Sequence, residues 1–426
     1  MNTQEKYKEY VNTAFVKAVE PIVIDRAKGA TYTDEEGNTF LDCFAGISVA
    51  NAGHGNARVI EAAKAQMDKL VHCCSYVYHV APVADLAEKL AQITPGRLKK
   101  SFFGNGGAEA IEGAIRLARR YTGKFEAIAL TQSFHGRSYA TLSLTGNCGR
   151  KIGGGPYMPG VAFTPAPYCY RCPFKLYNPE TCDMACAHYF EEVIRCHTAN
   201  DVAFFIAEPV MGEGGIIAPP DNYFKIIKEI CERHGILFIA DEVQAGFGRT
   251  GKMFAIDHYG VEPDILVLAK GIADGFPLSC FIARDEVADA FQVGDHLSTF
   301  GGNPVSCAAS LANIAFMEEE NLPAKALEKG AWFRKALSEI PSGQVVIGEV
   351  RGKGLMTGIE LVEDKKSKAP AAAQAGKIRA QLREKGILIG VGGGFGNVLR
   401  IQPPLTIGEE DLRRVVEAIK AVIAGN

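Results

Sequence analysis

Long apolar runs alternate with amphipathic stretches between about residue 100 and residue 310 of the chain. The runs are AIALTQ (127–132), DVAFFIAEPV (201–210), ILFIADEV (236–243) and DILVLAKG (264–271). Runs that are apolar at nearly every position are typical of strands buried on both faces, as in a parallel sheet covered by helices. One intervening stretch, YFKIIKEICERHG, has helical spacing and ends at Gly235, a residue type favoured where helices terminate. The pattern predicts an α/β domain whose ligands bind beyond the carboxyl ends of the strands.

The pattern changes on both sides of this region. Residues 311–426 mix helices with short strands, and we expect a smaller α+β domain there. Its last helix is expected near 408–424, with a capping box formed by Thr406 and Glu409. The opening segment contains TYTDEEGNTFLD, which predicts a hairpin turning at Glu36–Asn38. We therefore expect an N-terminal segment (1–50), a large domain (51–310) and a small C-terminal domain (311–426).

Composition narrows the class of protein. The 426 residues are 47% hydrophobic and 22% charged, with a net charge of −3, which is an ordinary globular balance. This charge gives no electrostatic reason to bind nucleic acid or an anionic membrane. The first residues are polar and no apolar run is long enough to span a bilayer, so a cytoplasmic protein is expected.

Four of the twelve cysteines lie close together in the sequence PYCYRCPFKLYNPETCDMACA. They are Cys169, Cys172, Cys182 and Cys186. Paired cysteines of this kind could ligate zinc or an iron–sulfur centre, or they could be packing residues of an inserted loop. Paired spacing alone does not decide between these two interpretations. We predict no metal site in this chain.

Two of the predicted strands end in opposite charges, Asp241 and Lys270. Because the carboxyl ends of parallel strands meet at one edge of a sheet, we expect these side chains to lie close together. A salt bridge would explain the pair, and so would a pyridoxal phosphate site. In such a site a lysine amine forms a Schiff base with the cofactor aldehyde, and an aspartate pairs with the pyridine nitrogen. The glycine-rich GNGGA (104–108) precedes an amphipathic helix and could hold the phosphate, although a tight turn has the same pattern.

The segment Phe134–Arg137 (FHGR) follows another predicted strand. Its aromatic residue could stack on a ring and its arginine could bind a carboxylate, but a capped loop with a surface arginine fits the same residues.

With these motifs in place, the sequence resembles the class III, fold-type I pyridoxal-phosphate aminotransferases. This group includes 4-aminobutyrate, ornithine and acetylornithine aminotransferases. The resemblance covers nearly the whole chain and is carried by eight segments. They are GISVANAGH (46–54), FFGNGGAEAIEGAIRLAR (102–119), SFHGR (133–137), AEPVMGEGG (207–215), IADEVQAGFGRTG (239–251), LAKGIADGFPLS (268–279), STFGGNP (298–304) and LRIQPPLTI (399–407). It implies a mostly parallel seven-stranded sheet in the large domain, and an N-terminal segment (1–50) that packs with the small domain.

The resemblance also implies which residues hold the cofactor, pyridoxal 5'-phosphate. Lys270 would form the Schiff base and move the proton, and Asp241 would hold the pyridine nitrogen. Gln244 would bond near the ring hydroxyl. The remaining implied contacts are Phe134 and Val243 on the ring faces, the Gly107 and Ala108 amides on the phosphate, His135 and Glu208 nearby, and Thr299 reaching the neighbouring subunit's cofactor. A homodimer, or a dimer of dimers, follows from the last contact.

Substrate residues are implied in the same way. Arg137 matches the arginine with which 4-aminobutyrate-type enzymes bind a carboxylate. Glu213 and Arg400 match a gate in which the arginine pairs either with the glutamate or with a substrate α-carboxylate. Ile47 and Tyr76, with Tyr78 beside them, are expected at the entrance.

Two departures keep other functions open. The cysteine-bearing insertion at 168–186 is absent from many family members, and IQPPL after Arg400 resembles relatives that racemise or epimerise amino acids. Those relatives tend to lack Arg137, so we favour transamination from an ω-amino acid such as 4-aminobutyrate to 2-oxoglutarate or pyruvate. A racemase or epimerase is the first alternative. A non-catalytic metal-binding or scaffold protein on the same fold is the second.

Overall fold

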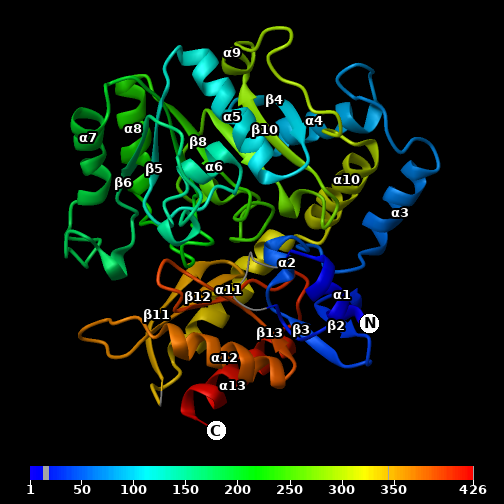
Figure 1. Cartoon of the computed structure of the whole chain (residues 1–426), viewed down its shortest axis with the longest axis vertical. Helices are drawn as coiled ribbons and strands as arrows, with labels where there is room; N and C mark the ends of the chain where they lie inside the picture. The colour runs from blue at the N-terminus through cyan, green and yellow to red at the C-terminus, as the bar shows by residue number, and fades with distance from the viewer. Residues whose placement is uncertain (13–18, 344, 426) are drawn as a thin grey trace.

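The computed structural model describes residues 1–12, 19–343 and 345–425. Figure 1 shows two parts, one above the other. The upper part is built around one large sheet, and the lower part contains both ends of the chain and two smaller sheets.

The large sheet has seven strands in the order β4-β10-β9-β8-β7-β5-β6. Only β10 is antiparallel to its neighbours. The strands are β4 (Leu98–Gly104), β5 (Glu126–Leu130), β6 (Val161–Thr164), β7 (Val202–Ala207), β8 (Leu237–Asp241), β9 (Ile265–Leu268) and β10 (Ser279–Arg284). The four apolar runs therefore form β5, β7, β8 and β9, and the expected mostly parallel seven-stranded sheet is confirmed.

Helices bury both faces of this sheet. On β7, Phe204 and Ile206 face a cluster containing α5 (Gly107–Thr122), while Phe205 lies in the core that contains α7 (Ala185–His197) and α8 (Tyr223–His234). Gly235 ends α8 with φ 61°, as its place in the sequence predicts. The other helices of this part are α3 (Ala57–Met67), α4 (Ala81–Ile93), α6 (Tyr139–Leu144), α9 (Asp285–Ala288) and α10 (Pro304–Glu319).

The lower part joins segments from both ends of the chain. β1 (Ile24–Lys28), β2 (Thr31–Asp34) and β3 (Thr39–Asp42) continue into β13 (Ile387–Leu388), which runs parallel to β3. The predicted hairpin connects β2 and β3, and Gly37 in its turn has φ 87°.

A second, antiparallel sheet has the order β11-β12-β15-β14. Its strands are β11 (Val346–Lys353), β12 (Met356–Val362), β14 (Gly390–Gly392) and β15 (Val398–Ile401). The helices of the lower part are α1 (Thr3–Tyr10), α2 (Ala45–Ser48), α11 (Leu322–Ser338), α12 (Ala372–Glu384) and α13 (Glu409–Ala424). The expected smaller α+β part is confirmed.

Two expected details, the cap of the last helix and the domain boundary at residue 310, differ from what the structure shows. The capping box is wrong, because α13 begins after Gly408 without a side-chain cap and the Thr406 hydroxyl is buried without a partner. The expected boundary at residue 310 falls inside α10, which packs against α3 and α4. The division at 50 and 310 stays a prediction, and its first segment includes residues 13–18, which lie outside the described residues. In the described part of the chain, no helix has the length and apolar character needed to cross a membrane.

Candidate active site

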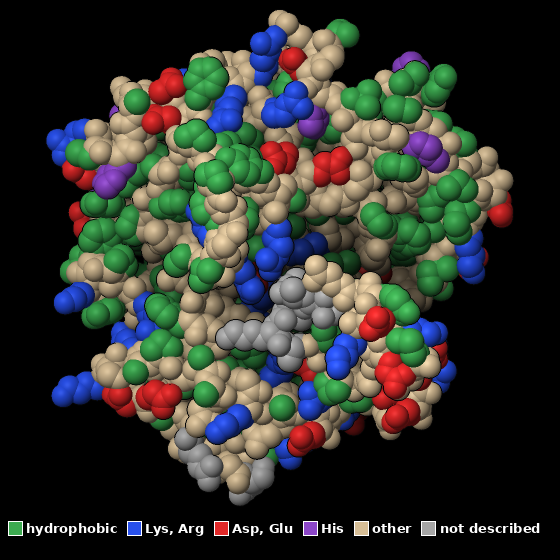
Figure 2. Space-filling model, viewed as in Figure 1, with side chains coloured by type: hydrophobic (Ala, Val, Ile, Leu, Met, Phe, Trp, Pro, Cys, Tyr) green, Lys and Arg blue, Asp and Glu red, His purple; other side chains and the backbone are tan. Residues whose placement is uncertain are grey.

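A cavity of about 150 Å³ opens at the carboxyl ends of β8 and β9. Its lining brings together Gly107, Ala108, Phe134, His135, Gly136, Glu208, Asp241, Val243, Gln244 and Lys270. These residues come from the ends of four strands and the first turn of α5. Nine of them are residues that the sequence singled out as cofactor contacts. Figure 2 shows Lys and Arg side chains gathered in the hollow between the two parts of the molecule.

Asp241 and His135 form a buried pair on the floor of this cavity. His135 Nδ1 lies 2.7 Å from Asp241 Oδ2, and the exposed fractions of the two side chains are 0% and 3%. The other carboxylate oxygen accepts a hydrogen bond from the Val243 amide at 3.0 Å. Contacts on both oxygens fix the orientation of the carboxylate, so it can be presented to a protonated ring nitrogen without rearrangement.

Lys270 is held in an unusual backbone conformation directly after β9. It has φ 51°, in the left-handed region that residues with a Cβ seldom adopt, and it opens a short 3₁₀-helix (Lys270–Ile272). Burial and the neighbouring Arg400 lower the pKa of the amine to about 8, although Asp241 and Glu208 oppose the shift. At pH 7 about a tenth of the amine is therefore unprotonated, far more than for an ordinary lysine, and the unprotonated form is the one that acts as a nucleophile and proton acceptor.

Glu208 links two loops that border the cavity. Its carboxylate accepts hydrogen bonds from the Phe134 amide at 3.0 Å and the Gly212 amide at 2.9 Å. Burial raises the pKa of this carboxyl to about 7, with a further contribution from Asp241. Glu208 thus fixes the position of Phe134, whose ring would cover one face of a bound cofactor.

The first turn of α5 supplies an anion site. Gly106 precedes the helix, and a 16-residue helix leaves amide N–H groups without acceptors at its start. A Cβ added to Gly107 would lie 2.9 Å from Val243 Cγ1, so this glycine permits the close approach of α5 to β8. The cavity therefore offers an amine, a carboxylate, an aromatic face and an anion site, which fit the aldehyde, ring nitrogen, ring and phosphate of pyridoxal phosphate.

A buried polar cluster adjoins the amine. Arg400 donates to Glu213 Oε2 at 2.7 Å and to Gln244 Oε1 at 2.9 Å. Gln402 also donates to Gln244 Oε1, at 2.9 Å, and to Ser48 Oγ at 2.7 Å. Gln244, expected near the ring hydroxyl, is here engaged with Arg400 and Gln402.

Two residues of this cluster were not predicted. Gln402 follows Arg400 by two positions, and the period of a strand places such residues on one face, so its position could have been inferred. Arg150 donates to Glu213 Oε1 from Nε at 3.0 Å, and its Nη2 contacts the same oxygen. No local pattern connects Arg150 with Glu213, because Arg150 ends a short 3₁₀-helix and Glu213 lies in a turn 63 positions further along the chain.

Several predicted site residues do not line the cavity in this single chain. Arg137 is exposed, with its guanidinium carbon 5.7 Å from the centre of the Phe134 ring. The Tyr76 hydroxyl is engaged with the backbone of Phe103, 2.8 Å from its carbonyl and 2.6 Å from its amide nitrogen. Ile47 and Thr299 are exposed. The roles of these four residues stay predictions.

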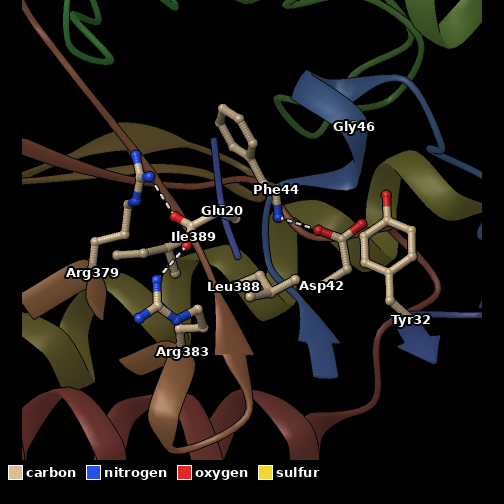
Figure 3. A pocket seen from close by; sticks show the side chains of 9 residues that line it. All are labelled: Glu20, Tyr32, Asp42, Phe44, Gly46, Arg379, Arg383, Leu388 and Ile389. Atoms are coloured by element: carbon tan, nitrogen blue, oxygen red, sulfur yellow. Dashed lines mark hydrogen bonds and ion pairs between the residues drawn. The ribbon is translucent and has the colours of Figure 1, made fainter. Parts of the chain in front are cut away.

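A second cavity, of about 170 Å³, lies in the lower part of the molecule (Figure 3). Glu20 sits between two arginines of α12, Arg379 and Arg383, and contacts both. Phe44 borders this cavity, and its ring centre is 5.3 Å from the guanidinium carbon of Arg400. The Phe44 ring therefore connects the second cavity with the Arg400 cluster.

The four clustered cysteines line a small cavity beside Tyr168. Burial raises the pKa of Cys186 to about 12 and that of Cys169 to about 11. In the chain alone, burial therefore favours the neutral thiol form of Cys169 and Cys186. Within residues 1–12, 19–343 and 345–425, no three His, Cys, Asp or Glu side chains are grouped so that they could hold a metal ion. That the chain holds no metal stays a prediction.

Fold and site together define a fold-type I pyridoxal-phosphate enzyme. The chain belongs to the class-III aminotransferases, because the sequence profile of that family matches residues 14–423. The predicted family, enzyme class and cofactor are thereby confirmed.

Relatives named for different activities have similar sequence identities to this chain. An acetylornithine aminotransferase of Methanothermobacter thermautotrophicus is 40% identical over 95% of this chain and 94% of the relative. A 4-aminobutyrate aminotransferase of Mycobacterium tuberculosis is 38% identical, covering 95% and 91%. A leucine/methionine racemase of Thermococcus litoralis is also 38% identical, covering 99% and 94%. Among solved structures, a Bacillus anthracis aminotransferase has a TM-score of 0.93 with 33% identity and full coverage of both chains.

Proposed function

We propose that this enzyme transfers an amino group from an ω-amino acid such as 4-aminobutyrate to 2-oxoglutarate or pyruvate. The observation that carries the proposal is the Arg400–Glu213 ion pair beside the Lys270 amine. A buried guanidinium with an internal carboxylate partner can exchange that partner for a substrate carboxylate. The same site can thus accept a dicarboxylate in one half-reaction and a substrate with an uncharged end in the other.

The residues that line the cavity have different roles in the proposed reaction. When bound, pyridoxal phosphate supplies the aldehyde that takes up the amino group and the ring that stabilises negative charge on the substrate carbon. Lys270 would take a proton from the substrate carbon and deliver it to the carbon of the former cofactor aldehyde, which a pKa near 8 permits. Asp241, oriented by His135, would hold the ring nitrogen in its protonated form. The Gly107 and Ala108 amides would bind the phosphate.

Racemisation or epimerisation of an α-amino acid is the second candidate. It requires that the proton return to the α-carbon, so the same Lys270 chemistry would serve both reactions. The Arg400 cluster fits this candidate as well, because Arg400, which donates to Gln244 and Gln402, would bind the α-carboxylate of an amino acid. The similarity to the Thermococcus litoralis leucine/methionine racemase points the same way.

An assay without a keto acid separates the two functions. Purified holoenzyme is incubated with single L-amino acids, and the products are separated on a chiral column. The proposal predicts no D-enantiomer and no loss of the L-form beyond one equivalent per active site. Accumulation of D-enantiomer at catalytic rates would contradict transamination and would assign the enzyme to the racemising branch of the family.

A further inference from the structure

The gate carboxylate has two arginine partners. Arg400 Nη1 contacts Glu213 Oε2 at 2.7 Å, while Arg150 Nε contacts Oε1 at 3.0 Å. Arg400 comes from β15, and Arg150 ends a 3₁₀-helix (Cys148–Arg150) in the upper part of the molecule. Glu213 therefore bridges two cations that belong to different parts of the fold.

Burial differs across this triad. Arg400 is 2% exposed and Glu213 is 13% exposed, whereas Arg150 is 35% exposed. Arg400 also has partners that do not depend on Glu213, namely Gln244 Oε1 and the face of Phe44. When a substrate carboxylate binds Arg400, the guanidinium can stay in place and the Glu213 carboxylate has to move away.

A displaced Glu213 needs a cation. Although burial favours the neutral form, Arg400 and Arg150 hold the pKa of this carboxyl below its ordinary value, so it is charged at neutral pH. A largely buried carboxylate that loses its only cation is strongly destabilised. With Arg150 on its other oxygen, Glu213 keeps one cation when Arg400 is taken by the substrate.

We propose that Arg150 is a specificity-determining residue that receives the Glu213 carboxylate whenever Arg400 binds a substrate carboxylate. Arg150 would lower the KM of the dicarboxylate keto acid and leave that of the ω-amino acid donor nearly unchanged. This inference rests on the proposed function, because it assigns different states of the gate to the two half-reactions.

The test compares three variants in separate half-reactions. Arg150→Ala removes the second cation. Arg150→Lys restores a positive charge without the paired N–H donors of a guanidinium group. Lys151→Gln is the matched control, because Lys151 is the adjacent cation but donates to the Ser143 carbonyl at 3.1 Å. Rapid mixing with 4-aminobutyrate, and of the aminated enzyme with 2-oxoglutarate, gives KM and the maximal rate for each half-reaction from the cofactor absorbance.

Arg150→Ala is expected to raise the KM for 2-oxoglutarate about tenfold and to change the KM for 4-aminobutyrate less than threefold. Arg150→Lys should recover part of this loss, and Lys151→Gln should match the wild type. Equal changes in both half-reactions, or no change in either, would overturn the inference.

Binding of glutarate to the holoenzyme keeps the test independent of the reaction. Isothermal titration of wild type and Arg150→Ala measures the affinity of the gate for a dicarboxylate that cannot react. If wild type fails to aminate 2-oxoglutarate, the proposed function fails, and the glutarate affinities alone decide the inference. A weaker affinity of about tenfold in Arg150→Ala supports it, and an unchanged affinity refutes it.

Discussion

The Lys270 amine owes its reactivity to its surroundings. Burial and the Arg400 charge lower its pKa to about 8, which is below the ordinary value of 10.5. Because only the unprotonated amine attacks an aldehyde, the apoenzyme should take up pyridoxal phosphate faster as the pH rises through 8 and then level off. Stopped-flow absorbance between pH 6 and about 10 measures this, with N-acetyl-lysine methylamide as the reference amine. A profile that follows the reference amine would contradict the lowered pKa.

Asp241 is expected to act through its negative charge. Asp241→Asn keeps the size of the side chain but removes the charge that would hold the ring nitrogen protonated, so kcat should fall on the order of 10²-fold or more. His135→Asn removes only the group that orients Asp241, and we expect a smaller loss, about tenfold. Steady-state kinetics with saturating cofactor measures both. An Asp241→Asn enzyme within twofold of the wild type would exclude this role.

Sequence patterns predicted those site residues that lie at the carboxyl ends of strands. Asp241 and Lys270 end adjacent parallel strands, and this alone places them in one cavity. Arg150 could not be predicted, because its contact with Glu213 depends on the path of a loop outside regular structure. Nor could the sequence show that Arg400 donates to Gln244. In the fold both side chains have more than one polar neighbour, and the sequence does not indicate which of these contacts form.

At the scale of elements, the start of α5 depends on one glycine. A Cβ on Gly107 would meet Val243 Cγ1 at 2.9 Å, whereas a Cβ on Gly106 would meet no atom within 4 Å. Gly107→Ala should shift either Val243 or the helix start and weaken cofactor binding about tenfold, while Gly106→Ala should bind as the wild type does. Equilibrium titration of the two apoenzymes with pyridoxal phosphate makes the comparison. Equal affinities in both variants would show that binding of the phosphate group does not depend on the close contact between Gly107 and Val243.

The strands were predictable because burial on both faces leaves a clear apolar run. The helix expected near 408–424 is α13, but its cap was not predictable, since Thr406 and Glu409 have the spacing of a capping box while the Thr406 hydroxyl is buried without a partner. A local motif specifies which bonds are possible, and packing decides whether they form. The same limit applies to the cysteine cluster, whose spacing fits a metal site although burial favours neutral thiols.

At the scale of the whole molecule, the lower part is built from both ends of the chain. β3 and β13 pair although they lie far apart in the sequence, and no pattern in either strand specifies that partner. The resemblance to the family, and not the periodicity, led us to expect that the N-terminal segment packs with the small domain. The boundary between the two parts stays a prediction because α10 continues through residue 310.

We also predict that the active enzyme is a dimer. Thr299 is exposed in the single chain, as expected if it reaches the cofactor of a neighbouring subunit. Sedimentation should give twice the chain mass of 45.8 kDa, or four times if dimers associate. Thr299→Ala should then weaken the binding of the cofactor while leaving the sedimenting species unchanged. An active monomer would contradict this prediction.

The most direct test of the account measures glutamate formed from 4-aminobutyrate and 2-oxoglutarate by the holoenzyme, with Lys270→Ala as the control. We predict glutamate at a catalytic rate in the wild type, in equal amount to the semialdehyde product, and no turnover in Lys270→Ala. Glutamate formation that persists in Lys270→Ala would contradict the central role of this lysine. Absence of glutamate with 4-aminobutyrate and with longer ω-amino acids would contradict the proposed reaction.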